Sequence, residues 1–229
     1  MSTFGNKIIE FNKHLNFTNK LPEKIKVMNP FKENGEILLI SERFYNKFYN
    51  DNKKRKLMIG INPGRFGAGV TGIPFTDTKR LKDNCGIEIN SPITHEPSSV
   101  FIYELIEKYG GVEKFYGDFY INSIFPLALI NFNKKGNWVN CNYYDYPALL
   151  SATKPFIIEN LKKQISFGID TEKVFVLGKK NADMLKGINE KMHFFKNIIT
   201  LDHPRFIVQY KLKFKDKYLN EYLEKLSIE

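Results

Sequence analysis

Three polar side chains stand where predicted strands end, and together they could bind a ligand that has several polar atoms. Asn62 and Asn122 each donate and accept hydrogen bonds, and the imidazole of His203 can donate one while uncharged. Parallel strands bring their carboxyl ends to one edge of a sheet, where open α/β folds bind ligands. We therefore expect the three side chains to converge. Taken singly, an Asn after a strand is usually a turn residue and a lone His is usually structural.

A glycine-rich loop follows the first of these strands. The strand is the apolar run Leu57–Ile61, and it ends at Asn62-Pro63-Gly64, because proline lacks the N–H that a sheet needs and glycine tolerates a left-handed backbone. Gly67–Gly72 has the GxGxxG spacing of a dinucleotide site, but it stands several residues beyond the strand, and Pro74-Phe75 follows where a helix should continue. The loop also lacks the GK[ST] ending of a phosphate-binding P-loop. We expect the glycines to let a substrate approach the backbone.

Hydrophobic periodicity predicts strands that alternate with helices, and hence a parallel sheet covered on both faces. The predicted strands are residues 57–61, 119–124, 173–177 and 197–201. The predicted helices are residues 5–17, 35–49, 78–85, 98–109, 147–165, 178–192 and 206–228. Residues 131–142 are predicted to form a polar loop. We expect one domain over residues 1–229, a three-layer α/β/α fold around a mainly parallel four-stranded sheet.

The charge balance favours a polyanionic partner. Lys and Arg total 35 against 25 for Asp and Glu, which gives a net charge of +10 and a pI near 9.3. Nucleic acid is the first expectation, although an AT-rich genome, which encodes many lysines, would explain part of this excess. Cys85 and Cys141 supply neither a disulfide framework nor a metal cluster, and His14, His95 and His193 lack metal-ligand spacing. Without a signal segment or a long apolar run, we expect an intracellular, cytoplasmic protein with no membrane partner.

A longer motif begins at the end of the first strand. Gly60–Gly67, GINPGRFG, followed by Thr71–Phe75, TGIPF, closely resembles the first motif of the single-strand-selective monofunctional uracil-DNA glycosylases, a family of the uracil-DNA glycosylase superfamily. Residues 120–127, YINSIFPL, resemble that family's uracil-reading segment. His203-Pro204-Arg205 resembles its HPSPR motif without the Ser-Pro pair. The resemblance covers about residues 57–205 and implies the superfamily's α/β/α fold.

The resemblance also implies an activity: hydrolysis of the N-glycosidic bond of uracil in DNA, without metal or cofactor, as the first step of base excision repair. By resemblance, Asn62 positions the attacking water and His203 donates to uracil O2 as the base leaves. Asn122 would pair its NH₂ with O4 and its carbonyl with N3–H, so that cytosine leaves buried groups unpaired. Phe75 would stack on the flipped base, and burial in the core is its alternative.

The same match extends to neighbouring positions. The other predicted members of the base pocket are Gly60, Ile61, Pro63, Gly64 and Phe66. The predicted DNA contacts are Arg65, Pro204 and Arg205. We expect a monomer acting on single- or double-stranded DNA.

An amide at position 62 cannot remove a proton from water, so the resemblance implies a dissociative reaction in which water is captured late. No lysine stands in the matched motifs, and a Schiff-base lyase step is therefore not expected. Two alternatives remain open. One is a broader glycosylase that also acts on xanthine, whose imide also lies between two carbonyls. The other is a nucleic-acid-binding protein with the same fold and little catalysis.

Gly64 and Arg205 bear on specificity. In the better-known branch of the superfamily a Tyr at the position matching Gly64 blocks the C5 edge of the base and excludes thymine. Gly64 leaves room for water there, so we expect excision of 5-hydroxymethyluracil but not of thymine, unless Gly64 serves only the backbone geometry of the turn. Arg205 lies where the family inserts a wedge into DNA, and a phosphate contact is the alternative.

Overall fold

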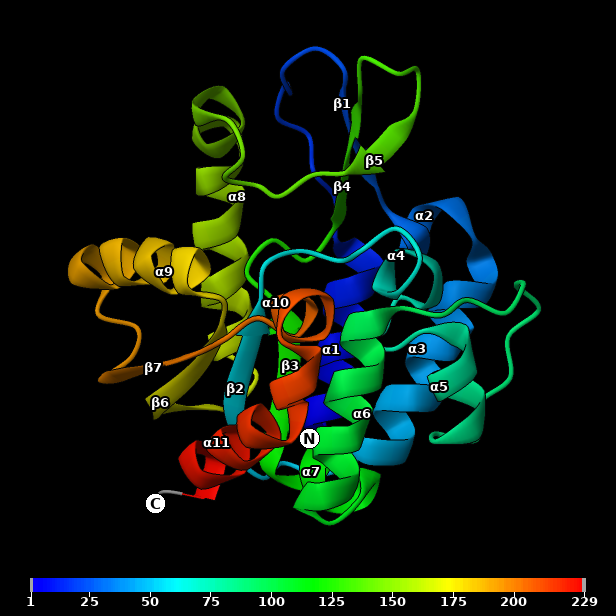
Figure 1. The fold of residues 1–229 in the computed structure, drawn as a ribbon, viewed down its shortest axis with the longest axis vertical. Helices are drawn as coiled ribbons and strands as arrows, with labels where there is room; N and C mark the ends of the chain where they lie inside the picture. Colours follow the sequence, from blue (N-terminus) through cyan, green and yellow to red (C-terminus); the bar gives the residue numbers. More distant parts are fainter. Residues whose placement is uncertain (1, 228–229) are drawn as a thin grey trace.

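A parallel sheet forms the middle of three layers in the computed structural model, which describes residues 2–227 (Figure 1). Its strands are β2 (Arg55–Gly60), β3 (Phe119–Ser123), β6 (Ile169–Leu177) and β7 (Asn197–Leu201). They lie in the order β3-β2-β6-β7, and every neighbouring pair is parallel. The central residues of β2 are fully buried, because helices cover both faces of the sheet. The predicted fold class and its four strands are confirmed.

Helices pack on the sheet and on one another. α7 (Val112–Asp118) contacts β2 and β3, whereas α8 (Pro147–Ile165) and α9 (Lys179–Met192) contact β6. α6 (Pro97–Tyr109) and α10 (Pro204–Tyr210) contact each other, and in Figure 1 α10 lies in front of β3 with α6 to its right. The other helices are α1 (Phe4–His14), α2 (Pro30–Glu33), α3 (Gly35–Phe48), α4 (Ala68–Thr71), α5 (Thr78–Asp83) and α11 (Lys215–Ser227).

A second, antiparallel sheet stands at the top of the molecule in Figure 1. It contains β1 (Ile25–Met28), β4 (Ala128–Phe132) and β5 (Trp138–Asn140), in the order β1-β4-β5. The prediction of a polar loop over residues 131–142 is therefore wrong. Asn131 of β4 pairs with Ile25 of β1, and a pairing between such distant segments leaves no local sequence signal.

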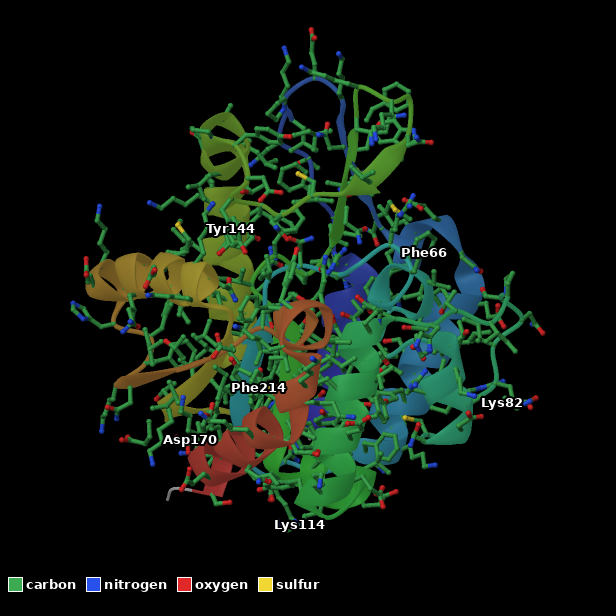
Figure 2. The ribbon with its side chains drawn as sticks, in the orientation of Figure 1. Phe66, Lys82, Lys114, Tyr144, Asp170 and Phe214 are labelled. Carbon is green, nitrogen blue, oxygen red and sulfur yellow. The ribbon has the colours of Figure 1, made fainter. Side chains whose placement is uncertain are left out.

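The prediction of one continuous C-terminal helix over residues 206–228 is also wrong. α10 begins earlier, at Pro204, and ends at Tyr210, and a 3₁₀ turn over Leu212–Phe214 leads into α11. No glycine or proline marks this break in the sequence. Position 228, the last of the predicted helix, lies outside the described residues. The break leaves Phe214 exposed on the connection between the two helices (Figure 2).

Buried aromatic side chains join α1 to the sheet. Phe4 packs edge-on against Tyr120 of β3, with ring centroids 5.6 Å apart. Arg55, at the start of β2, lies buried over the rings of Phe4 and Tyr49, at 4.9 and 4.7 Å. Its guanidinium pairs with Asp51 at 2.8 Å, which compensates the buried charge. Within residues 2–227, no helix is both long and apolar enough to span a membrane.

Candidate active site

The carboxyl ends of β2 and β3 open onto a cavity of about 310 Å³. The two strands are neighbours, with Gly60 opposite Ser123, and the chain continues from β3 back across β2 to β6. Such a change of direction leaves a crevice above the strand ends, where α/β proteins bind ligands. The volume suits a nucleobase. The cavity is lined by Ile61, Asn62, Pro63, Gly64, Ala68, Pro74, Phe75, Glu96, Ser98, Ser123, Asn140, Asn142, His203, Arg205, Phe206, Gln209 and Tyr210.

The amide of Asn62 is held at both ends by one backbone segment. Its Nδ2 donates to the carbonyl oxygen of Cys141 at 3.0 Å, and its Oδ1 accepts the backbone N–H of Tyr143 at 3.3 Å. Both partners belong to the connection between β5 and α8, so the small antiparallel sheet determines where this side chain points. Because Oδ1 has a second lone pair, it can also accept a hydrogen bond from a water molecule.

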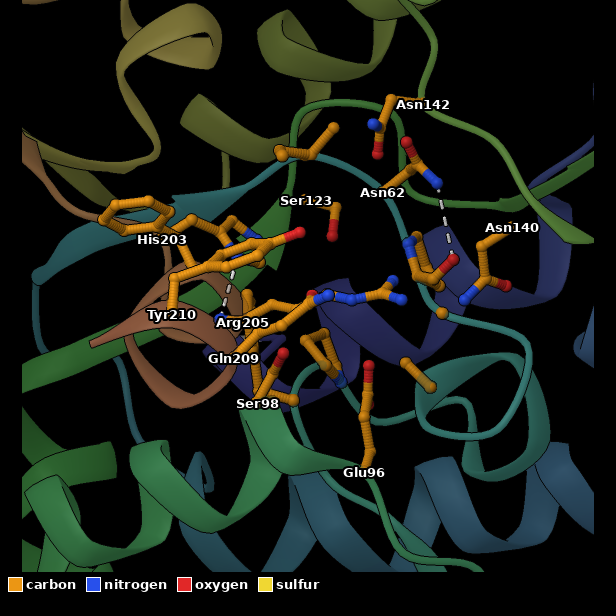
Figure 3. A pocket seen from close by; sticks show the side chains of 17 residues that line it. Asn62, Glu96, Ser98, Ser123, Asn140, Asn142, His203, Arg205, Gln209 and Tyr210 are labelled. Atoms are coloured by element: carbon orange, nitrogen blue, oxygen red, sulfur yellow. Dashed lines mark hydrogen bonds between the residues drawn. The ribbon is translucent and has the colours of Figure 1, made fainter. Parts of the chain in front are cut away.

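His203 follows β7 and is the N-cap of α10. Its Nδ1 accepts the backbone N–H of Arg205 at 3.1 Å, so the neutral ring carries its proton on Nε2 (Figure 3). Burial of the ring, with a smaller effect from the Arg205 charge, lowers the pKa of His203 to about 4. At neutral pH the imidazole is therefore an uncharged N–H donor at the cavity wall.

Phe75 lines the cavity in a backbone conformation that is rare for a bulky residue, with φ of 54°. Its ring lies against Gly60, where a Cβ atom would come within 2.7 Å of Phe75 Cζ. Gly60 is thus needed to let the ring sit on the strand end. The ring centroid lies 6.1 Å from that of His203. Phe75 is half-buried and faces the cavity, which fits a stacking surface better than an ordinary core position.

The structure does not bring Asn122 into this cavity. Its Nδ2 donates to Tyr120 Oη at 2.5 Å and its Oδ1 accepts the backbone N–H of Ser123 at 2.8 Å. Asn122 borders a separate void of about 10 Å³ instead. Successive residues of a strand point to opposite faces, and so Ser123 lines the cavity in its place. The expected convergence holds for Asn62 and His203 but not for Asn122.

The carboxyl group of Glu96 occupies the space beside Gly64. A Cβ atom on Gly64 would lie 2.7 Å from Glu96 Oε1, and one on Gly67 would overlap Glu96 Oε2. The backbone of Gly64 is not left-handed, so the constraint at this position is space and not the geometry of the turn. Burial, and then the charge of Asp77, raise the pKa of Glu96 to about 7, while Arg205 acts in the opposite direction.

The remaining predicted residues of the first motif divide between two places. Ile61 and Pro63 line the cavity as expected. Phe66 does not: its side chain is 53% exposed and lines an adjoining cavity of about 340 Å³ (Figure 2). Arg65 also points away, because its guanidinium donates to the Trp138 carbonyl at 2.6 Å and lies over the Phe66 ring.

α10 brings the last predicted residues to the site. Pro204 is buried at the first position of the helix, where its fixed φ suits the turn that His203 caps. Arg205 is exposed and lines the cavity, and its guanidinium and the Glu96 carboxyl point into the same part of it (Figure 3). Tyr210, at the end of α10, is 66% exposed and completes the wall on the His203 side.

Sequence reasoning missed several residues that line the cavity, and two groups of them had a usable signal. Glu96 and Ser98 flank Pro97, a pattern typical of a helix start, and α6 begins there. Asn140 and Asn142 lie in the segment assigned to a polar loop, at the end of β5. The missed residues are Glu96, Ser98, Ser123, Asn140, Asn142, Phe206, Gln209 and Tyr210.

The comparisons with known proteins agree with this fold and cavity. A family model described as the uracil DNA glycosylase superfamily matches residues 46–227. This is most of the chain, and the protein belongs to the uracil-DNA glycosylase superfamily. Among solved structures it is similar to the crystal structure of wild-type SMUG2 from Pedobacter heparinus, with 51% sequence identity, a TM-score of 0.96, and coverage of 98% of this chain and 97% of that one. No curated protein sequence matches significantly.

The similarity to SMUG2 places the chain in the SMUG-type branch of the superfamily, which confirms the resemblance found in the sequence. The protein is therefore a uracil-DNA glycosylase, a hydrolase of N-glycosidic bonds that acts on DNA in repair.

Proposed function

We propose that this glycosylase flips uracil into the 310 Å³ cavity and hydrolyses its bond to deoxyribose by a dissociative route, leaving an abasic site. One observation carries the proposal: the neutral imidazole of His203 and the oriented amide of Asn62 line the same cavity as the exposed face of the Phe75 ring. In this arrangement the base stacks on Phe75, His203 lies at its O2 edge, and Asn62 lies near the sugar.

The roles follow from how charge develops. As the bond breaks, the sugar becomes positive and the departing uracil becomes negative, with much of that charge on O2. His203 Nε2–H, donating to O2, stabilises the anion without carrying a charge of its own. The amide of Asn62 holds a water molecule but cannot deprotonate it, so the water adds only after the bond has largely broken.

Ser123 lines the cavity where Asn122 does not, and in the proposed arrangement it lies at the edge of the base that carries N3 and O4. A hydroxyl group either donates or accepts, so it distinguishes O4 of uracil from the amino group of cytosine less sharply than an oriented amide does. We therefore expect discrimination against cytosine to depend on more than this side chain.

An alkali-cleavage assay tests the proposal. An oligonucleotide with a single uracil is incubated with the protein and then heated in alkali, which breaks the strand only at an abasic site. Strand scission is expected with uracil and not with cytosine at the same position. Binding without scission would overturn the proposal. The same assay with xanthine tests the broader substrate range.

Arg205→Ala is expected to reduce excision from duplex DNA more than from single strands. Arg205 is exposed at the start of α10 and its long side chain can move from the cavity into the gap that a flipped base leaves in the stack. A single strand has no opposing strand to close that gap. The measurement is kcat/KM on one sequence in both forms, with the exposed Lys211→Ala as the control. Equal losses on both forms would indicate a phosphate contact instead.

Gly64→Tyr is expected to abolish excision of 5-hydroxymethyluracil while some action on uracil survives. The new side chain would fill the space at the Gly64 side of the base and displace the Glu96 carboxyl, which stands 2.7 Å from the Cβ position. Gly64→Ala should also reduce excision of 5-hydroxymethyluracil more than excision of uracil, but both losses should be smaller. Kinetics of both variants on both bases provide the measurement, and parallel losses would rule out a steric gate at this position.

A further inference from the structure

Glu96 is a helix N-cap residue whose side chain does not cap its helix. The backbone N–H of Glu96 donates to Asp77 Oδ2 at 2.8 Å, and its carbonyl accepts the N–H groups of Ser99 and Val100, so the main chain is fixed. The carboxyl group makes no hydrogen bond to the α6 N-terminus. Among residues 2–227, no donor hydrogen-bonds to it, although it lies against the glycine loop at the cavity wall.

This carboxyl group lies between two cavities. It lines the base cavity and also the adjoining cavity of about 340 Å³ that Phe66, Val208 and Gln209 border. Glu96 is half-buried at the cavity wall, so a bound base would exclude water from its carboxyl group, and a ligand group that donates to it would replace the hydrogen bond lost to water. The position therefore favours a substrate that carries a hydrogen-bonding group at this wall.

Ring geometry identifies the part of the base that faces Glu96. In a pyrimidine, C5 lies directly across the ring from C2. If O2 is held by His203, as in the proposed function on which this inference rests, C5 points to the opposite side of the cavity. Glu96 and His203 line different parts of the cavity wall in Figure 3, and Gly64, beside Glu96, has no side chain that would separate this carboxyl group from the base.

We propose that Glu96 is a specificity-determining residue that reads the C5 substituent of the flipped base, with the adjoining cavity taking up the substituent. The ionised carboxylate accepts a hydrogen bond from a C5 hydroxymethyl group, and the protonated acid donates one to a C5 formyl oxygen. A C5 methyl group would cover the carboxyl and return no hydrogen bond, which disfavours thymine.

Near neutral pH, Glu96 can be either protonated or ionised. Burial and Asp77 at the N-cap of α5 raise the pKa of Glu96 to about 7, and Arg205 of α10 opposes them. The preceding residue, His95, is exposed and contacts Arg80 Nη1 at 3.0 Å. Across the cavity, the lowered pKa of His203 keeps that ring neutral. Below pH 7 the acid form of Glu96 therefore prevails, and above it the carboxylate.

The test compares excision of uracil, thymine, 5-hydroxymethyluracil and 5-formyluracil from one single-stranded sequence, between about pH 5.5 and about pH 8.5. The readout is kcat/KM of each base divided by that of uracil. For the wild-type protein, the 5-formyluracil ratio should fall by about tenfold as the pH rises through 7, while the 5-hydroxymethyluracil ratio stays level. Glu96→Gln should make the 5-formyluracil ratio independent of pH, and Glu96→Ala should lower the 5-hydroxymethyluracil ratio by about tenfold.

A matched control makes the result decisive. Glu107→Gln, at an exposed position of the same helix, should keep the wild-type ratios. The intrinsic reactivity of each base is the same for every variant, so only the protein changes the ratios. A wild-type 5-formyluracil ratio that does not change with pH would overturn the inference without any variant, and so would wild-type ratios in Glu96→Ala. A protein that fails to excise uracil at all would refute the proposed function instead.

Discussion

Asn62→Ala is expected to lower kcat for uracil excision by about a hundredfold or more, because the water that attacks the sugar loses its position. DNA affinity should change little, since most of it comes from phosphate contacts distributed over the protein surface. Single-turnover kinetics and a separate binding titration distinguish the two quantities. The exposed Asn220→Ala is the control for a general effect of removing an amide. Near-normal turnover in a folded Asn62→Ala variant would remove this residue from the mechanism.

The same site makes Asn62→Asp informative. A carboxylate could deprotonate water, and on that ground alone it should accelerate the reaction. In this structure, however, Asn62 Nδ2 donates to the Cys141 carbonyl at 3.0 Å, and an aspartate would set a negative oxygen against that carbonyl. We therefore expect the aspartate variant to lose its orientation and to fall short of the wild-type rate.

His203→Ala is expected to lower kcat by about a hundredfold to a thousandfold, the range found when one donor to a developing anion is removed. KM should change less than kcat, because the hydrogen bond to O2 strengthens as the bond breaks. Single-turnover rates at saturating enzyme are the measurement. A His203→Ala variant that excises uracil at the wild-type rate would contradict the assigned role.

The lowered pKa of His203 also predicts how stability depends on pH. The ring protonates near its ordinary pKa of about 6.5 in the unfolded chain but only near 4 in the folded protein. Between those values the unfolded state binds more protons, so the contribution of His203 to stability is present above 6.5 and is lost as the pH falls through 4. The thermal unfolding temperature of His203→Gln should therefore fall less steeply than that of the wild type as the pH is lowered over this interval.

The strands of the parallel sheet could be predicted because each contains a short apolar run, although β6 begins four residues earlier than predicted, in a polar stretch. The antiparallel sheet could not, because β1 and β4 are short and lie far apart in sequence. The break between α10 and α11 was missed for a related reason. α10 ends at Lys211, whose φ is −127°. Any residue can adopt this conformation, so no residue type in the sequence predicts it.

Asn122 shows the limit of motif matching within a correctly predicted strand. The sequence located β3 to within one residue, but a strand alternates its side chains, and a difference of one position moves a residue from the cavity to the opposite face. The structure places Ser123 at the cavity and turns Asn122 toward Tyr120. The sequence around Pro97 signals the start of α6, but the place of the Glu96 carboxyl at the cavity depends on how α6 packs beside the glycine loop, which no spacing in the sequence records.

The way in which Asn62 is held has a consequence for the history of this fold. Both of its partners, the carbonyl of Cys141 and the N–H of Tyr143, are main-chain atoms. Main-chain atoms are present whatever the side chain, so the water site depends directly on the path of the chain, which the buried side chains of Cys141 and Tyr143 help to fix. A one-residue insertion or deletion between β5 and α8 would shift that path at once. Descendants of this enzyme are therefore expected to keep the length of this connection even where its exposed residues change.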